Sequence, residues 1–314
     1  MFKRSITGIA AGVLLACAIA AAHAQTVELL PVETVTLTTQ QFLTGDENGK
    51  PAVLAGELRI PKPGTDLLPA VVLLLGAGGI TPMIERWSQD FNDIGIASFM
   101  LDSFSGRGIG PSKLDNVAMM IDGYRALDIL AAHPRIDPAR IAVMGISKGA
   151  MAALYSSNQR FVDMYSLQHR VFAAHIVLFA PCNITYRDDV KITGKPIRMF
   201  HGIADDLFSI EPCRAYAGRL KASGADVELT EFPDAYHAFH AFVLKAPQIF
   251  PQAMTTRNCH MIEGDNGQIM NVVTGKPFDY ADSCVERGFT FAYNEAAALA
   301  THAAVRAFLT ATLK

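Results

Sequence analysis

Short apolar runs alternate with stretches of helical length from Val53 to the C-terminus of the chain. The runs are rich in β-branched and aliphatic residues, which is typical of strands that are covered on both faces. This alternation predicts an α/β protein with a mainly parallel central sheet and helices on both faces. The expected strands are Val53–Ile60, Ala70–Leu75, Ile96–Leu101, Arg140–Met144, His175–Phe179, Ile197–His201 and Val227–Glu231, and the expected helices are Pro82–Asp93, Asn116–Ala132, Lys148–Ser156, Glu211–Ser223 and Asn294–Thr312.

Three segments depart from the alternation. Residues Glu33–Leu43 predict an additional antiparallel strand at the sheet edge, followed by the turn residues Gly45–Gly49. Residues Ser103–Ser112, directly after a strand, are rich in Gly, Ser and Arg. The segment 246–288 is polar and turn-rich, and a loop of this length needs a tether or a function. Because no linker stands out, we expect residues 25–314 to form a single domain that carries 246–288 as an insertion.

The first 24 residues are typical of a bacterial export signal. Lys3 and Arg4 precede an apolar run, which ends in Ala22-His23-Ala24, a small-x-small cleavage site that leaves Gln25 as the new N-terminus. A membrane-anchoring helix is the first alternative, but the run is short and rich in Ala and Gly. Lipoprotein processing at Cys17 is the second. It is disfavoured because a bulky leucine stands at position 15 and the apolar run continues past the cysteine. The sequence therefore predicts a periplasmic or secreted protein.

The composition narrows the classes of partner. The formal net charge of −3 over 314 residues comes without a basic stripe, so nucleic-acid binding has no electrostatic support. After residue 24, no uninterrupted apolar run approaches the length of a transmembrane span, so no membrane span is expected in the mature chain. The sequence also contains no pattern that indicates a bound cofactor or metal.

The most specific motif is Gly145-Ile146-Ser147-Lys148-Gly149. The pattern G-x-S-x-G alone recurs by chance, but here an apolar strand enters it and an Ala-rich helix leaves it. A strand-to-helix turn this tight strains the serine and presents its hydroxyl above the sheet, at the N-terminus of a helix. An ordinary turn between strand and helix is the alternative. The context favours Ser147 as a catalytic nucleophile.

A nucleophilic serine needs a base, and the base needs an acid that orients it. In folds with this turn the order along the chain is serine, acid, histidine. Asp205 follows the strand Ile197–His201 and is the expected acid, with Asp206 as the near alternative. His237 lies in the loop after the next strand and is the expected base. It is preferred over His240, for which a structural role is expected, while a helix N-cap or a structural histidine remains the alternative for the chosen pair.

The developing oxyanion needs two backbone donors. The amide of Lys148 is one candidate, and the glycine-rich segment Leu75-Gly76-Ala77-Gly78-Gly79 supplies the other, with Ala77 preferred and Gly78 second. A phosphate-binding loop is the competing interpretation of this segment. It is weak because neither G-x-x-x-x-G-K-[ST] nor G-x-G-x-x-G is present.

With these residues in place, the chain resembles the dienelactone hydrolase family of α/β hydrolases, and most closely an exported proteobacterial branch. The resemblance is carried by the segments 71–79, 101–108, 145–149, 201–206 and 232–239, which occur in the expected order. It implies the α/β-hydrolase fold and supports Asp205 and His237 as acid and base. Two departures are that Ser147 stands where dienelactone hydrolases proper have a cysteine, and that Leu75 replaces a histidine found in many relatives.

Removal of Cys17 leaves Cys182, Cys213, Cys259 and Cys284, an even set in an oxidising compartment. Of the three pairings we choose Cys182–Cys213 and Cys259–Cys284. The first would join the ends of neighbouring strands beside the acid loop, and the second would tether the insertion. Buried free thiols are the alternative, and a zinc site is disfavoured because no C-x-x-C spacing occurs.

These residues together predict hydrolysis of a small carboxylic ester or lactone through an acyl-enzyme. The loop 103–112 is expected to line the pocket, with Gly78, Phe104 and Arg107 as substrate contacts. Arg107 would bind a substrate carboxylate or, equally well, form a structural salt bridge. Two other functions compete: a peptidase of the oligopeptidase type, disfavoured because no repeat domain precedes the serine, and a non-catalytic binding protein, disfavoured because all three triad positions are filled.

Overall fold

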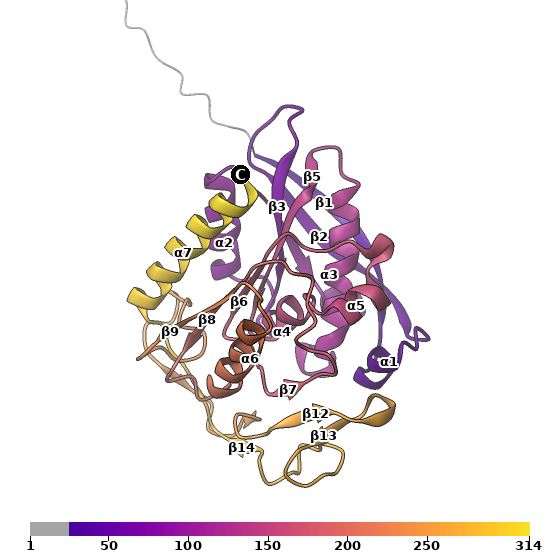
Figure 1. Ribbon diagram of the computed structural model, residues 1–314. Helices are drawn as coiled ribbons and strands as arrows, with labels where there is room; N and C mark the ends of the chain where they lie inside the picture. The colour runs from indigo at the N-terminus through magenta and orange to yellow at the C-terminus, as the bar shows by residue number, and fades with distance from the viewer. Residues whose placement is uncertain (1–24) are drawn as a thin grey trace, which may run out of the picture.

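The computed structural model describes residues 25–314, and its centre is an eight-stranded sheet (Figure 1). Strands β1 and β2 pair antiparallel at one edge, and β2 is antiparallel to β4, whereas the remaining neighbours are parallel. The expected mainly parallel sheet is confirmed. In spatial order the strands are β1 (Thr26–Thr36), β2 (Lys50–Ile60), β4 (Ala97–Asp102), β3 (Leu68–Leu74), β5 (Ile136–Ile146), β6 (His175–Leu178), β8 (Ile197–Gly202) and β9 (Val227–Phe232).

Helices cover both faces of the sheet because alternate strand residues point to opposite sides. Val71 and Leu73 pack with α2 (Pro82–Asp93) and α7 (Glu295–Leu313), which lie together at the left of Figure 1. Val72 points to the other face of the sheet and packs in a second hydrophobic cluster there. That cluster includes residues of α1 (Thr39–Thr44), α3 (Asn116–Ala131), α4 (Lys148–Tyr155), α5 (Gln159–Tyr165) and α6 (Glu211–Ala222).

The expected edge strand Glu33–Leu43 is wrong in its second half. The strand β1 begins at Thr26 and ends at Thr36, and residues 39–44 form the short helix α1. Thr38 caps this helix in a capping box with Gln41, and Gly45 ends it in the left-handed conformation at φ 74°. These local signals at both ends outweigh the apolar content of the segment.

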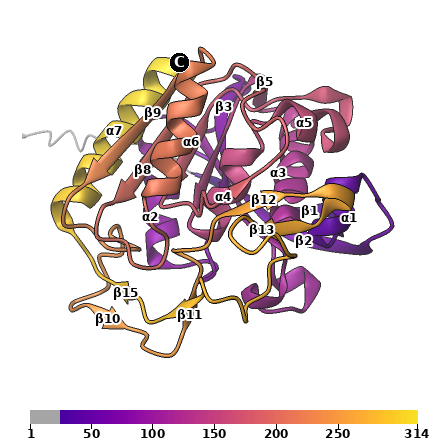
Figure 2. The same ribbon diagram turned by 60° about the horizontal axis from the view of Figure 1, so that its bottom comes forward.

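The insertion extends over residues 246–292, four residues more than the expected 246–288, and so includes the last short strand. It adds small sheets at the end of the main sheet that faces the viewer in Figure 2. Four of its strands form two separate two-stranded sheets. A hairpin of two further strands pairs with β7, which lies outside the insertion, and together they form a third sheet. Its strands are β10 (Gln248–Ile249), β11 (Met254–Thr255), β12 (Met261–Glu263), β13 (Ile269–Asn271), β14 (Glu286–Arg287) and β15 (Thr290–Phe291), with β7 at Ile184–Thr185 and 3₁₀ turns at Ser105–Arg107, Pro111–Lys113, Leu167–His169 and Asp265–Gly267.

Helix α7 is long and apolar enough, by length and composition alone, to cross a membrane, although Glu295, His302 and Arg306 interrupt its apolar residues. Its Val305, Leu309 and Leu313 side chains are buried against the sheet. On another side, His302 and Arg306 contact the Asp90 carboxylate of α2. A helix with one buried stripe and charged partners alongside has the amphipathic character of a core helix at the protein surface.

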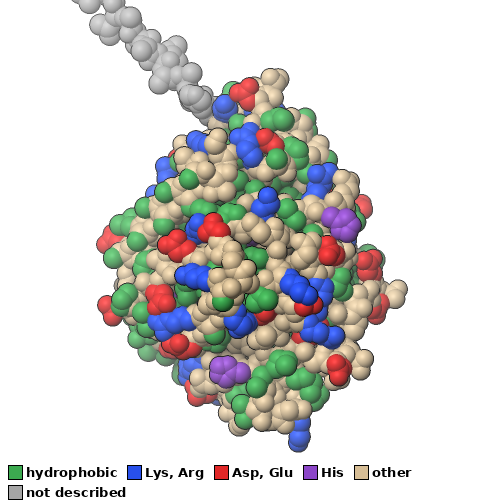
Figure 3. Space-filling view, viewed as in Figure 1, with side chains coloured by type: hydrophobic (Ala, Val, Ile, Leu, Met, Phe, Trp, Pro, Cys, Tyr) green, Lys and Arg blue, Asp and Glu red, His purple; other side chains and the backbone are tan. Residues whose placement is uncertain are grey.

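Charged side chains of both signs are interspersed over the face seen in Figure 3. Lysine and arginine side chains alternate there with aspartate and glutamate rather than forming a continuous basic stripe.

His175, the first residue of β6, is completely buried. Its Nδ1–H donates to the carbonyl of Ala153 at 2.8 Å, while burial lowers the pKa of the imidazole to about 4. The unfolded chain therefore takes up this proton near pH 6.5, whereas the folded protein takes it up near pH 4. As a result, the free energy of unfolding falls as the pH drops from 6.5 towards 4.

We predict that His175→Asn weakens this acid sensitivity. Between pH 7 and pH 5, protonation of His175 in the unfolded chain lowers the free energy of unfolding by about 2 kcal/mol. The Asn variant lacks this pH-dependent loss. The Asn amide keeps a donor near the Ala153 carbonyl. Urea unfolding at both pH values measures the difference, with His260→Asn, an exposed histidine, as the control. An equal loss of stability in the variant and the wild type would contradict the prediction.

Candidate active site

Ser147 occupies a strained turn between β5 and α4, at φ 52° and ψ −113°. Two glycines make the turn sterically feasible. A Cβ on Gly145 would lie 2.2 Å from the carbonyl oxygen of Gly149, and a Cβ on Gly149 would lie 2.2 Å from that of Leu74. Only glycine fits at either position without moving backbone. The strand, the turn and the helix are thus held in close contact, and the serine hydroxyl is presented at the end of the sheet.

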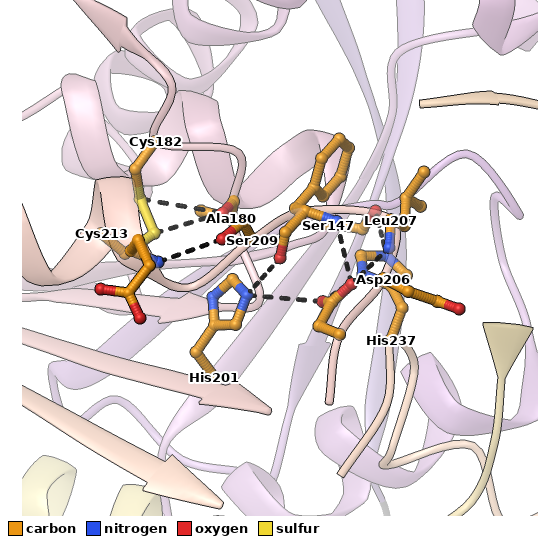
Figure 4. A network of polar contacts seen from close by, with 12 residues as sticks. Ser147, Ala180, Cys182, His201, Asp206, Leu207, Ser209, Cys213 and His237 are labelled. Carbon is orange, nitrogen blue, oxygen red and sulfur yellow. Dashed lines mark hydrogen bonds and ion pairs between the residues drawn. A yellow bond between two sulfur atoms is a disulfide. The ribbon is translucent and has the colours of Figure 1, made fainter. Parts of the chain in front are cut away.

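The hydroxyl of Ser147 lies beside an imidazole from another loop (Figure 4). Ser147 Oγ is 2.9 Å from His237 Nε2, and His237 Nδ1 is 2.8 Å from Asp205 Oδ2. An ionised carboxylate only accepts hydrogen bonds, so Nδ1 carries the proton and Nε2 offers a lone pair to the Ser147 hydroxyl. The imidazole is 1% exposed. These contacts form a continuous chain from carboxylate to hydroxyl.

The carboxylate of Asp205 is buried but well supplied with donors. Its Oδ1 accepts the backbone N–H groups of Leu207 and Phe208 at 3.0 and 2.9 Å. Burial alone raises the pKa of this carboxyl, but the neighbouring imidazoles, His237 foremost, and the Phe208 N–H outweigh it and lower the pKa below its usual value. Asp205 is therefore ionised at neutral pH and can orient the imidazole.

A second histidine, His201, faces the same carboxylate, and no role was expected for it from its position in the chain. It lies in β8, four residues before Asp205, and its Nε2–H donates to the carbonyl of Phe208 at 2.9 Å. The same nitrogen lies 3.4 Å from Asp205 Oδ2. Burial lowers the pKa of His201, so the ring is neutral at pH 7 and acts as a donor. The signal available in the sequence was an imidazole at the end of the strand that precedes the acid turn.

Asp206, the alternative acid, points to the insertion instead of to the imidazole. Its Oδ1 accepts the amide of Thr290 at 2.7 Å, and its Oδ2 accepts the Thr290 hydroxyl at 3.0 Å. The guanidinium of Arg257 also contacts the Asp206 carbonyl. The insertion therefore holds the acid loop from outside, through the residue next to Asp205.

His240, the alternative base, is buried and stacks on Phe179, with ring centroids 5.2 Å apart. Burial lowers its pKa to about 3. These are the surroundings of a neutral core histidine, the role expected for it from the sequence. The structure brings His237 to Ser147 and leaves His240 in the core.

Aromatic rings enclose the His237 imidazole. Phe291 of the insertion lies nearly parallel to it at 5.1 Å, and the edges of Phe179 and Phe208 meet it at 4.7 and 5.3 Å. The amide of Ala292 donates to the His237 carbonyl at 3.3 Å. The insertion therefore contacts the base as well as the acid loop, so its packing fixes both side chains.

Two disulfides brace these loops. Cys182 is bonded to Cys213, which joins the segment after β6 to the first turn of α6, directly after the acid loop. Cys259 is bonded to Cys284 within the insertion. These are the two pairings expected from the sequence. The first is drawn beside the His201 ring in Figure 4.

The glycine-rich loop after β3 passes directly beside the nucleophile. A Cβ on Gly76 would lie 3.5 Å from Ser147 Cβ, so Ala77, the next residue, follows close to the hydroxyl. The amide of Lys148 opens α4, where the first N–H groups of a helix have no intrahelical acceptor. The Lys148 ammonium is held elsewhere, by the carbonyl of Leu114 at 2.6 Å and by Asn116 Oδ1. The Lys148 side chain is therefore bound by residues other than those around the Ser147 hydroxyl, and its backbone N–H is a separate donor at the start of α4.

A cleft of about 530 Å³ opens beside this loop. Gly78 and Phe104, two of the three expected substrate contacts, line it together with Ala77. The other lining residues are Gly79, Ile80, Asp102, Ser105, Gly108, Ile109 and Pro111.

Arg107, the third expected contact, is absent from this lining and forms a buried ion pair. Its guanidinium binds both carboxylate oxygens of Asp122 at 2.7 and 2.8 Å. The remaining N–H groups donate to Thr36 Oγ1 and to the carbonyls of Ser103 and Val35. Because all five donors have protein acceptors, the salt-bridge alternative describes Arg107, and the substrate-carboxylate role does not.

Within residues 25–314, no group of three or more His, Cys, Asp or Glu side chains is arranged to hold a metal ion. The side chains of Ser147, His237 and Asp205 are each supplied with protein hydrogen-bond partners. The arrangement offers a hydroxyl, a lone pair and backbone donors, which together suit acyl transfer.

Comparison with known proteins supports the same family. No curated protein matches the sequence. A protein described as a dienelactone hydrolase from Klebsiella pneumoniae shares 14% identity, with a TM-score of 0.57 and coverage of 90% of this chain and 99% of its own. A dienelactone hydrolase-like promiscuous phosphotriesterase from metagenomic libraries shares 15% identity, with a TM-score of 0.60 and coverage of 92% and 99%. At this identity these structures show the α/β-hydrolase fold.

The family model of the dienelactone hydrolase family matches residues 60–249, which is more than half of the chain. The matched range includes the serine turn, the acid loop and His237. The chain therefore belongs to the dienelactone hydrolase family and is a carboxylic ester hydrolase.

Proposed function

We propose that this protein cleaves carboxylic esters or lactones through an acyl-enzyme, with Ser147 as nucleophile, His237 as base and Asp205 as acid. The single observation that carries the proposal is the hydrogen-bonded chain from Asp205 Oδ2 through the imidazole to Ser147 Oγ, at 2.8 and 2.9 Å. A serine hydroxyl is a weak nucleophile without such a base. The strained turn and the buried carboxylate are the supports that this chemistry requires.

In acylation, Ser147 Oγ attacks the carbonyl carbon of the ester while its proton moves to His237 Nε2. The carbonyl electron pair moves onto oxygen and produces a tetrahedral oxyanion. When that intermediate collapses, the bond to the leaving alkoxide breaks and the alcohol takes the proton from His237. Asp205 remains ionised and stabilises the imidazolium through its bond to Nδ1–H.

The amides of Ala77 and Lys148 are the proposed donors to the oxyanion. Gly76 lies against Ser147, so the Ala77 amide follows close to the nucleophile, and the Lys148 N–H begins α4 directly after it. Fixed donors at a water-depleted site stabilise developing charge without reorganising, and removal of one such donor typically costs about 3 kcal/mol of barrier. Gly78 is the second choice for the loop donor.

Deacylation repeats the sequence with water. His237 takes a proton from a water molecule, whose oxygen attacks the acyl carbon and again forms the oxyanion. Collapse releases the carboxylic acid and returns the proton to Ser147 Oγ. A lactone follows the same path, with the alcohol remaining attached to the released acid.

We also propose that residues 25–314 act as one domain in the periplasm or outside the cell, after cleavage following Ala24. Two disulfides among the four remaining cysteines favour an oxidising compartment. The export signal itself lies outside the described residues, and so does Cys17.

We predict that Ser147→Ala lowers kcat for p-nitrophenyl butyrate by at least about 1,000-fold, because it removes the hydroxyl that contacts His237 Nε2. Release of p-nitrophenolate measures the rate, and thermal unfolding of the variant serves as the control for folding. Labelling of the wild type by a fluorophosphonate, lost in the variant, tests the same oxygen. Turnover close to that of the wild type would contradict the assignment of the nucleophile.

We predict that Asp205→Asn lowers kcat by about 100- to 10,000-fold, because the amide no longer fixes the imidazole tautomer or stabilises its charge. The matched control is Asp206→Asn, which removes a carboxylate at the neighbouring position while Oδ1 still accepts the Thr290 amide. The control is expected to lose less than tenfold in the same p-nitrophenyl butyrate assay. Equal losses in both variants, or a larger loss at 206, would reject Asp205 as the acid.

We predict that the mature protein begins at Gln25 and carries no free thiol. Intact-mass spectrometry of the protein exported by a bacterial host gives the cleavage site. Maleimide labelling after denaturation without reductant counts thiols, with a reduced sample expected to label four cysteines. A lipid-modified N-terminal Cys17, or a retained signal, would contradict the cleavage site, and maleimide incorporation without reduction would contradict the pairing.

A further inference from the structure

The cleft beside the oxyanion loop carries one ionisable side chain among its lining residues, the carboxylate of Asp102. Asp102 ends β4, and the backbone then turns through Phe104 and Ser105 into the 3₁₀ turn that borders the cleft. Ala77 and Gly78 also line the cleft. Ala77 follows Gly76, whose Cβ would lie 3.5 Å from Ser147 Cβ, so the cleft begins close to the nucleophile.

The Asp102 carboxylate is built to remain charged. Its Oδ1 accepts the backbone N–H groups of Phe104 at 2.8 Å and Ser105 at 3.2 Å. Burial raises the pKa of this carboxyl, but the hydrogen bonds from Ser105 and Phe104 outweigh it, so the pKa lies below its usual value. Both backbone N–H groups bind Oδ1, and neither binds Oδ2.

Three cations lie in this region, and none of them lines the cleft. Lys113, two residues after Pro111, is exposed, and the other two are bound by protein groups. Arg107, five residues after Asp102, has all five N–H groups bound by protein, with its charge matched by Asp122. The Lys148 ammonium is held by the Leu114 carbonyl and Asn116. The cleft therefore has a negative field with no lining cation to balance it.

We propose that Asp102 is a charge filter that makes this enzyme select neutral and cationic esters and reject esters that carry a carboxylate. A second carboxylate in the cleft would meet Asp102 in a partly desolvated space, where like charges repel more strongly than in water. A trimethylammonium or ammonium group would be attracted. This inference rests on the proposed function, since it concerns the substrate of the Ser147 site.

The test compares three p-nitrophenyl esters with acyl chains of matched length. These are the hexanoate, the adipate half-ester with a terminal carboxylate, and the 6-(trimethylammonio)hexanoate. A second series places the same three kinds of charge on the alcohol, in acetate esters of para-substituted phenols, because the cleft receives either half of the substrate. The measured quantity is kcat/KM for each ester in the wild type and in Asp102→Asn.

The variant keeps the turn, because an Asn oxygen still accepts the two N–H groups, and removes the charge. In at least one series, the anionic-to-neutral ratio of kcat/KM is expected to rise about five- to tenfold in the variant, and the cationic-to-neutral ratio to fall. Comparing ratios between the two enzymes cancels the intrinsic reactivity of each ester. Asp66→Asn, at an exposed carboxylate outside the cleft, is the control for net charge and should leave both ratios unchanged.

A second measurement uses only the wild type, so that a folding defect in the variant leaves the proposal testable. Raising NaCl from 20 mM to 1 M screens the repulsion, so the anionic-to-neutral ratio is expected to increase severalfold. Ratios independent of both Asp102 and salt in both series would overturn the charge filter. That result would leave the triad untouched if Ser147→Ala were still inactive on all six esters, whereas activity in Ser147→Ala would reject the proposed function instead.

Discussion

The close approach of backbone around Ser147 is the constraint on which the rest of the site depends. Gly145 packs against the backbone of Gly149, and Gly149 packs against the backbone of Leu74 at the end of β3. The nucleophile is therefore fixed relative to the central strands. The order of those strands then decides what can reach it. The loops after β5, β8 and β9 all lie at the carboxyl end of the sheet, because these strands are parallel. An acid and a histidine far along the chain thereby meet one hydroxyl.

The sequence was a good guide wherever local pattern and topology coincide. Every expected strand from Val53 onward and every expected helix is present within a few residues, because buried parallel strands leave long apolar runs. Helix α1 was misjudged because Thr38 and Gly45 act locally, while the apolar residues between them suit a strand equally well. The strands of the insertion are two or three residues long, too short for any periodicity. They follow from contacts with the acid loop and with β7, which no local pattern encodes.

The same distinction separates the site residues. Asp205 and His237 could be proposed because chain order in this fold limits the choices to two candidates each. The role of Arg107 could not be decided, because its partner Asp122 lies in another helix and a sequence does not record which acceptors surround a guanidinium. His201 was overlooked for a similar reason. Its relevance to the site comes from the distance of 3.4 Å between its Nε2 and Asp205 Oδ2. In the sequence, it cannot be told apart from other buried residues of a strand.

The two flanks of the reacting serine are built differently, and this difference bears on substrate choice. On the flank of the base, the Cys182–Cys213 bridge, the Asp206–Thr290 contacts and the ring of Phe291 hold the acid loop and His237 from several directions. On the other flank, an open cleft is bordered by glycines, by apolar side chains such as Phe104, and by one carboxylate. A relay that depends on distances of 2.8 and 2.9 Å needs rigid surroundings, whereas a recognition surface tolerates variation. Charge discrimination on the open flank can therefore change through Asp102 without disturbing the proton relay.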